Sequence, residues 1–334
     1  THNPWGSHVS SGGSSGGAGS AVMAGIGVLA HGNDIGGSLR FPAAANGAVT
    51  VKPGLGRIPA WNSTQKNERG MLAQSMSVQG LLTRSVGDLD LAMPAMVVSD
   101  AHDPFHVPLE YRLASVDAPL RVAFCTETPG FDTHPDVAKA LQNAADALKD
   151  AGYQVEEKNI PFLEETGNCG FRALMGEVSV MMGKDIREYG SETIQNIFTE
   201  YFKYFPPFEG DELIKIMAKR THYARKWSLF LKDYPLILSP FLPQPFFAPG
   251  RDSEGAAGVK DVLGSALWSY SMNFIGQPAG CMPTHIAKLE SNIQPVNIQI
   301  IGQRWREDLI VDAMSAIESR VGTFQNQLWA QMDK

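Results

Sequence analysis

Two clusters of glycine and serine near the start of the chain are the residues best suited to chemistry. The first spans residues 12–20 and reads GGSSGGAGS, and the second spans residues 34–40 and reads DIGGSLR. Glycine permits backbone conformations that other residues rarely adopt, so that several N–H groups can surround one point. A serine beside such N–H groups can act as a nucleophile whose oxyanion intermediate is stabilised. The pattern therefore predicts covalent catalysis by a serine.

Other interpretations of these clusters fit the residues less well. Gly/Ser-rich sequence usually forms flexible linkers, but residues 21–30 between the clusters are too apolar to stay in water. They are predicted to form a buried short helix or a pair of strands, which periodicity alone does not distinguish. A Walker loop ends in Gly-Lys-Ser/Thr, and neither cluster is followed by lysine. Dinucleotide loops and Gly-x-Ser-x-Gly elbows need an apolar strand upstream, whereas residues 1–11 are polar and short.

Residues 12–40 resemble the signature block of the amidase-signature hydrolases, and the match is dense and specific. Further segments that are similar to the family are Asn3-Pro4-Trp5, Asp34 to Pro42, Val51-Lys52-Pro53, Gln79 to Asp88, Asn273 to Ala279 and Ile298 to Gly302. Together these segments bracket nearly the whole chain. The resemblance implies an α/β fold in which helices sandwich a mixed central β-sheet.

The resemblance also assigns roles at a Ser–cis-Ser–Lys catalytic triad. By motif, Ser38 is the nucleophile, and Ser14 is the bridging serine, whose preceding peptide bond is cis in the family. The backbone N–H groups that would form the oxyanion hole belong to Ile35, Gly36, Gly37 and Ser38. The residues expected to support the site are Ser15, Asp34 and Arg40. Losing one oxyanion-hole donor typically costs about 10²–10³ in rate.

The chemistry implied is hydrolysis of a carboxylic amide to an acid and ammonia or an amine. A desolvated lysine can act as the base because burial lowers its pKa. The proton would pass from Ser38 through Ser14 to this lysine. Ser38 would then attack the amide carbonyl, an acyl-enzyme would form as the relay protonates the leaving amine, and water would complete the reaction.

The catalytic lysine lies well upstream of the glycine-rich block in the family. Residues 1–13 contain no lysine, and the first lysine of the chain is Lys52, which matches a structural segment of the family. We therefore expect the chain to be an N-terminally truncated amidase that lacks the catalytic lysine. Two alternatives follow: an amidotransferase A subunit, which would need partner subunits, and an inactive fragment or binding protein that retains the fold.

Charged side chains near the serines allow further interpretations. His8 and His31 could pair with a serine, but neither has an obvious acidic residue to orient it, and His31 more plausibly ends a strand. Asp34 and Arg40 flank the nucleophile. We expect them to form a buried ion pair that holds the oxyanion loop. The alternative for Arg40 is to bind a carboxylate group of the substrate.

Composition narrows the function classes. The chain has 334 residues, of which 43% are hydrophobic and 19% charged, which is ordinary for a soluble enzyme. Its net charge of −7 does not suggest nucleic-acid binding, and no run of eighteen apolar residues predicts a membrane span. The cysteines, at positions 125, 169 and 281, lack the spacing of a zinc or disulfide framework, which fits the cytoplasm. We expect a small-molecule amide as substrate, no metal or organic cofactor, and a possible homodimer.

The elements that must position the site are clearest in the middle of the chain. Residues 120–124, 134–151 and 153–157 are predicted to form a parallel strand–helix–strand unit, with Gly152 ending the helix. Residues 162–265 are dominated by helical patterns over 171–182, 191–202 and 211–233. We expect a single domain over residues 1–334, corresponding to the C-terminal portion of an amidase. Residues 162–265 would form a helical substrate-pocket insertion within it.

Two C-terminal segments are predicted to complete the sheet. Residues 273–285 should return to the sheet near the active site, and residues 298–301 should form a strand. Residues 306–332 should form one or two final helices.

Overall fold

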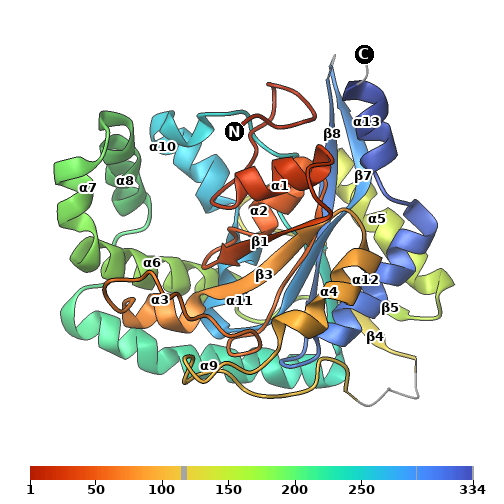
Figure 1. Ribbon diagram of the computed structural model, residues 1–334. Coiled ribbons are helices and arrows are strands. Elements are labelled where there is room, and N and C mark those ends of the chain that lie inside the picture. The colour runs from red at the N-terminus through yellow and green to blue at the C-terminus, as the bar shows by residue number, and fades with distance from the viewer. Residues whose placement is uncertain (114–118, 291, 333–334) are drawn as a thin grey trace.

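Strands from the whole length of the chain form one mixed β-sheet in the computed structural model, which describes residues 1–113, 119–290 and 292–332. Among these residues the sheet has eight strands in the order β1-β3-β2-β7-β8-β6-β4-β5 (Figure 1). The strands are β1 (Leu29–Asp34), β2 (Val49–Lys52), β3 (Val78–Thr83), β4 (Arg121–Phe124), β5 (Gln154–Glu157), β6 (Leu236–Pro240), β7 (Ala279–Leu289) and β8 (Asn292–Gly302). Pairs β4–β5 and β4–β6 are parallel, and the other pairs are antiparallel.

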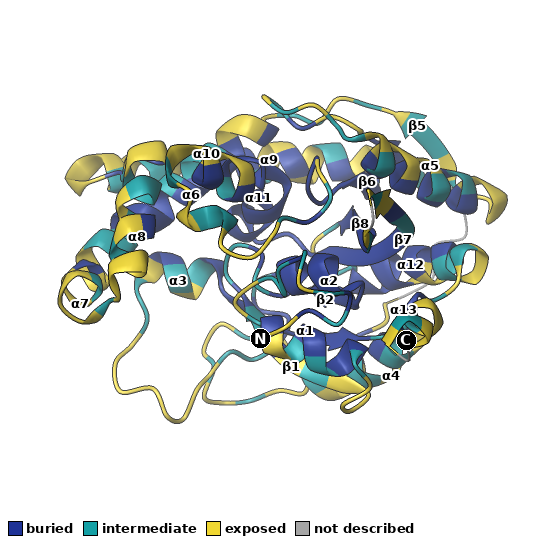
Figure 2. Ribbon diagram, turned by 90° about the horizontal axis from the view of Figure 1, so that it is seen from above, coloured by how far each residue is buried: buried dark blue, intermediate teal, exposed yellow. Residues whose placement is uncertain are grey.

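Helices cover both faces of this sheet, and each face has its own hydrophobic core (Figure 2). Successive residues of a strand point to opposite faces. In β6, for example, Leu236 and Leu238 enter one core and Ile237 enters the other. The helices of the first core are α4 (Val86–Met96), α5 (Pro135–Asp150) and α12 (Glu307–Val321). The other core includes α2 (Arg40–Asn46), α3 (Met71–Met76), α6 (Leu163–Met181), α9 (Gly210–Asp233) and α11 (Leu267–Ile275). The predicted fold class, a mixed sheet sandwiched by helices, is confirmed.

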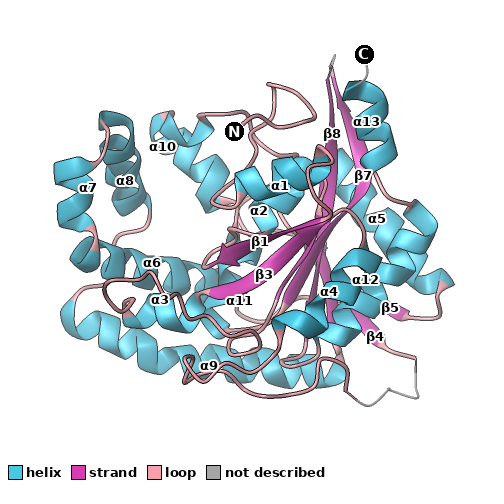
Figure 3. Cartoon of the chain, viewed as in Figure 1, coloured by secondary structure: helices cyan, strands magenta, loops and turns pink. Residues whose placement is uncertain are grey.

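The predicted strand–helix–strand unit is also observed. Helix α5 connects β4 to β5, and these two strands pair in parallel (Figure 3). The helix begins where His134 accepts a hydrogen bond from the Asp136 N–H, at 3.1 Å. It ends before Gly152, whose φ of +91° favours glycine. Capping and amphipathic spacing therefore located these elements correctly.

Residues 162–265 are mainly helical, but they also contribute an inner strand of the sheet. The helices are α6, α7 (Gly183–Tyr189), α8 (Glu192–Tyr204), α9 and α10 (Gly255–Val259), with a 3-10 turn at Arg251–Ser253 and a π-helical turn at Lys260–Gly264. Figure 1 shows α7 and α8 projecting away from the sheet. Strand β6 lies between β8 and β4, so the range predicted as a helical insertion is built into the sheet.

The apolar segment at residues 21–30 differs from its prediction. Helix α1 (Gly16–Met23) ends within it, and a turn at residues 24–28 leads into β1. Ile26 is 72% exposed and Val28 is 59% exposed, so the expected burial is wrong for this turn. The reason is that β1 is an edge strand of the described sheet, with a neighbour on one side only. His31 lies inside β1, which continues to Asp34, rather than at its end.

Further structural observations concern membrane spans, metal ligands, cysteines and the final helix. The described part of the chain holds no helix that is both long and apolar enough to span a bilayer. Within the same residues, no three histidine, cysteine or acidic side chains are grouped as metal ligands. The three cysteines are free thiols. A final helix, α13 (Gln325–Met332), follows α12, as the sequence allowed.

Candidate active site

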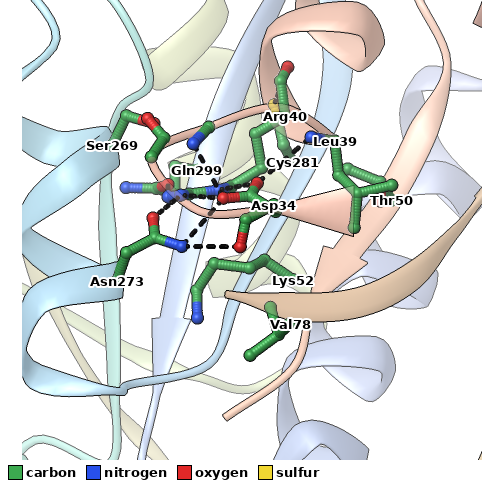
Figure 4. A network of polar contacts seen from close by, with 12 residues as sticks. Asp34, Leu39, Arg40, Thr50, Lys52, Val78, Ser269, Asn273, Cys281 and Gln299 are labelled. Atoms are coloured by element: carbon green, nitrogen blue, oxygen red, sulfur yellow. Dashed lines mark hydrogen bonds and ion pairs between the residues drawn. The ribbon is translucent and has the colours of Figure 1, made fainter. Parts of the chain in front are cut away.

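The loop that carries Ser38 connects the end of β1 to the start of α2. Asp34, the last residue of β1, turns its carboxylate back under this loop (Figure 4). One carboxylate oxygen accepts the Gly37 N–H at 2.7 Å, and the other accepts the Leu39 N–H at 3.2 Å. Asp34 is fully buried. The short loop is therefore folded around one carboxylate.

Arg40 neutralises that carboxylate from within the same buried layer. Its Nε and Nη2 atoms each lie 3.0 Å from an oxygen of Asp34, and both side chains are 0% exposed. Burial opposes ionisation of Asp34, but the charge and hydrogen bonds of Arg40 outweigh it, so the pKa of Asp34 is lowered. Arg40 has no exposed surface with which to reach a substrate. The geometry supports the structural interpretation of this pair and not the carboxylate-binding one.

Two amides from distant parts of the chain complete this network, and the sequence did not reveal their role. Asn273 of α11 accepts from Arg40 Nη2 at 2.6 Å and donates to both the carboxylate and the carbonyl of Asp34 at 2.9 Å. Gln299 of β8 accepts from Arg40 Nη1 at 3.0 Å. Both residues lie in segments that resemble the family, and residues 273–285 were expected near the site. That resemblance was the only available signal.

The first serine cluster lies against the second. The Ser15 N–H donates to the Ser38 carbonyl at 3.2 Å, which joins the two loops directly. The Gly13–Ser14 peptide bond is cis, as the resemblance implied. A Cβ atom on Gly32 would lie only 2.6 Å from the Ser15 Oγ, so the first loop packs closely on β1. The structure thus brings together Ser14, Ser15 and Ser38.

The hydroxyls of Ser14 and Ser38 differ in exposure and in hydrogen bonding from the buried side chains of Asp34 and Arg40. Ser14 is exposed, and Ser38 is half-buried. Throughout the described residues, neither hydroxyl has a hydrogen-bond partner in the protein. Both are therefore accessible to a ligand.

The four predicted oxyanion-hole donors do not have the same surroundings. The Gly37 N–H is bound by Asp34, so in this structure it is not free to bind an oxyanion. The cause is the turn that Asp34 stabilises, and the role of Gly37 in an oxyanion hole stays a prediction. The N–H groups of Ile35, Gly36 and Ser38 have no protein partner among the described residues. Three donors are thus available on this loop.

Lys52 ends β2 and lies beside Asp34 in the buried layer (Figure 4). Burial, followed by the charge of Arg40, lowers the pKa of Lys52 from its ordinary 10.5 to about 7. Its Nζ donates to the Pro53 carbonyl at 2.8 Å. No hydrogen bond joins it to Ser14 or Ser38 in the described structure. Lys52 belongs to the layer beneath the loop and does not contact the serine hydroxyls.

The two histidines near the serines in sequence do not pair with them. The His8 ring lies 3.2 Å from the Ile293 carbonyl, at the start of β8. His31 is exposed on the edge strand β1. The structure therefore gives no support for a Ser–His arrangement with either residue.

An aromatic cluster borders the serine loops. The Phe41 ring, one residue after Arg40, lies 5.1 Å from that of Phe241, 6.1 Å from that of Phe246 and 6.3 Å from that of Phe247, between ring centroids. The Ser10 N–H donates to the Phe247 carbonyl at 3.0 Å, which attaches this cluster to the loop that leads to Ser14. Phe247 is half-buried and the other three rings are buried.

The mixed sheet and its helices are shared with solved structures of amide-cleaving enzymes. A 6-aminohexanoate cyclic dimer hydrolase complexed with substrate superposes with a TM-score of 0.79, covering 96% of this chain and 70% of that chain at 24% identity, which concerns the fold alone. The bacterial aryl acylamidase of the amidase-signature family gives a TM-score of 0.79 at 22% identity, covering 99% of this chain and 70% of that one, and again concerns the fold alone.

Sequence comparison defines the family more closely. The family model described as Amidase matches residues 1–311. The indoleacetamide hydrolase of Bradyrhizobium diazoefficiens is 39% identical over all 334 residues of this chain. The chain belongs to the amidase family, which confirms the resemblance. It spans 63% of the length of that relative, and 71% of the indoleacetamide hydrolase of Bradyrhizobium japonicum, to which it is 38% identical.

Proposed function

We propose that this chain carries the nucleophile and the oxyanion-binding loop of an enzyme that hydrolyses a carboxylic amide. The observation that carries the proposal is the junction of the two serine loops through the Ser15 N–H and the Ser38 carbonyl. The Ser14 loop thus lies beside the loop in which three N–H groups have no protein partner among the described residues. Such an arrangement suits a nucleophile, a proton carrier and oxyanion donors.

In the proposed mechanism, the Ser38 Oγ attacks the carbonyl carbon of the amide while its proton passes to the Ser14 hydroxyl and on to a base. The carbonyl oxygen becomes an oxyanion and accepts hydrogen bonds from the N–H groups of Ile35, Gly36 and Ser38. The intermediate then collapses, the C–N bond breaks, and the amine leaves with the relayed proton. Water attacks the resulting ester, releases the acid and restores the Ser38 hydroxyl.

We propose that the base is a lysine other than Lys52. The Nζ of Lys52 is held by the Pro53 carbonyl beneath the loop, whereas the Ser14 hydroxyl is at the surface. The competing function is a binding protein or an inactive fragment with the same fold. The exposed Ser14 hydroxyl, which has no basic partner in the described residues, favours that competitor.

For the substrate, we propose a small primary amide of an arylacetic acid. Two relatives named indoleacetamide hydrolase are 39% and 38% identical to this chain, whereas the glutamyl-tRNA(Gln) amidotransferase protein of Deinococcus radiodurans is 28% identical. The half-buried Phe247 ring, which borders the serine loops, supports an aromatic acyl group, because aromatic rings pack favourably on one another. An amidotransferase function is the less favoured alternative.

Fluorophosphonate labelling of the 334-residue chain, located by peptide mass mapping, tests the mechanism. We expect label on Ser38 that is absent in Ser38→Ala. Label on Ser14 instead would contradict the assignment of the nucleophile. A folded chain that takes no label would favour the inactive fragment. Hydrolysis of indole-3-acetamide, compared with an aliphatic amide of similar size, tests the substrate.

A further inference from the structure

One peptide unit of the oxyanion loop is held at both ends. A trans peptide is planar, with its C=O and N–H pointing in opposite directions. In the unit that joins Gly36 to Gly37, the N–H donates to Asp34 at 2.7 Å, and the C=O accepts from the Ser269 Oγ at 2.9 Å. The orientation of this unit determines the backbone directions on either side of it. Two of the three unpaired donors, Gly36 and Ser38, are its immediate neighbours.

Ser269 contacts the loop from a buried position on a helix. It is 0% exposed and lies on α11, which also carries Asn273 one turn later. Residues four apart lie on the same helix face, so Ser269 contacts the Gly36 carbonyl of the loop while Asn273 contacts Asp34 at the end of β1. Gln299 fixes the helix to the sheet by donating to the Trp268 carbonyl at 3.1 Å. The helix therefore contacts both the loop and the end of the strand that leads into it.

The contact also explains a glycine in the loop. A Cβ atom on Gly37 would lie 2.4 Å from the Ser269 Oγ and 2.5 Å from the Phe41 ring, and the φ of Gly37 is +131°. Both the space and the backbone conformation therefore require glycine. At Gly36, the nearest contact for a Cβ would be 3.9 Å away. The loop therefore packs closely against Ser269 at Gly37, whereas a Cβ atom would have space at Gly36.

We propose that Ser269 is a positioning residue for the oxyanion hole: its hydroxyl holds the Gly36 carbonyl against α11 and so keeps the neighbouring N–H groups directed at the substrate. The inference rests on the proposed function and adds a residue to it. Without the hydroxyl, the peptide unit keeps, among the described residues, only the hydrogen bond to Asp34, and it gains freedom to rotate. The N–H groups of Gly36 and Ser38 then lose a fixed direction, and stabilisation of the transition state falls.

The test compares Ser269→Ala with Ser271→Ala. Ser271 is the matched control because it lies on the same helix, is also 0% exposed and, among the described residues, donates only to the Leu267 and Leu163 carbonyls. We expect Ser269→Ala to accelerate amide hydrogen exchange over residues 35–39 and to slow fluorophosphonate labelling of Ser38 about ten-fold, less than the loss of a whole donor. Ser269→Thr, which keeps a hydroxyl, should restore both. Ser271→Ala should change neither.

With an amide substrate, Ser269→Ala should lower kcat and leave KM unchanged, because the oxyanion-hole donors act on the transition state. Exchange and labelling that are equal in Ser269→Ala and Ser271→Ala would overturn the proposal. If the unmodified chain takes no label at Ser38, the proposed function fails. Hydrogen exchange still decides whether Ser269 fixes the loop, because it does not depend on catalysis.

Discussion

The two serine loops are stabilised in opposite ways. The Ser38 loop rests on a buried layer in which Asp34 and Arg40 satisfy each other and are joined by amides from α11 and β8. The Ser14 loop has no charged partner among the described residues, and it is held by a backbone hydrogen bond and by close packing on β1. The difference shows that the Ser38 loop is fixed by buried polar side chains, whereas the Ser14 loop is held by backbone contacts and packing.

Removing Arg40 should have the largest effect on stability. Arg40→Leu removes the hydrogen-bonded counter-ion of the buried Asp34 carboxylate, and breaking such a pair typically costs about 3–5 kcal/mol. The control is Arg112→Leu, because Arg112 pairs with Asp90 and Asp312 at the surface, where such pairs contribute about 0–1 kcal/mol. Urea denaturation measures both free energies of unfolding. Equal losses in the two variants would show that the Ser38 loop does not depend on this buried pair.

The two glycines of the Ser38 loop should respond differently to alanine. Gly37→Ala meets Ser269 and Phe41 and requires an unfavourable φ, so we expect a loss of about 2 kcal/mol. Gly36→Ala has open space and should change stability by less than about 0.5 kcal/mol. Thermal unfolding compares the two variants. A tolerant Gly37 would mean that the Ser38 loop adapts easily and is not fixed by the interior.

Lys52 should make the stability of this buried layer depend on pH. Its pKa is about 7 in the folded chain and near 10.5 when unfolded, so between these values the unfolded state binds more protons. Stability should therefore rise with pH from about 7 to 10, by at most about 1.4 kcal/mol per pH unit. Below pH 7 both states are protonated and this dependence ends.

Urea denaturation at several pH values measures the effect, and Lys52→Met should remove the rise. Lys139→Met is the control, because Lys139 is exposed on α5. If stability still rises with pH to the same extent in Lys52→Met, another titrating group is responsible for the rise.

Ser14 should have the smallest effect on stability. Its hydroxyl is exposed and unpaired among the described residues, so Ser14→Ala should alter the free energy of unfolding by less than about 0.5 kcal/mol, while labelling of Ser38 is lost. Ser20→Ala is the control in the same segment. Ser20 is buried and donates to Asn46 at 3.0 Å, so we expect a loss of about 1 kcal/mol without loss of labelling. A larger loss of unfolding free energy in Ser14→Ala than in Ser20→Ala would contradict the contrast between the Ser14 loop and the Ser38 loop.

Sequence patterns predicted those elements whose formation depends on residues that are close together in the sequence. The capped, amphipathic helix α5 and its flanking strands were correct, because periodicity and end residues specify them. The serine loops were found from a dense motif. Asn273 and Gln299 had no assigned role, because they meet Asp34 and Arg40 across 239 and 259 positions of sequence. Only the folded sheet brings such residues together, and the exposed turn at residues 24–28 likewise depends on where β1 lies in the sheet.

The separation between Arg40 and Gln299 also has a consequence for folding during synthesis. The ribosome adds about 5–20 residues per second. Gln299 follows Arg40 by 259 positions, so it is made roughly 10–50 s later at that speed. Until β8 emerges, the nascent chain carries Asp34 and Arg40 without the amides that complete their layer. The buried layer beneath the Ser38 loop is completed only after β8 has been made, so its assembly is a late event in folding.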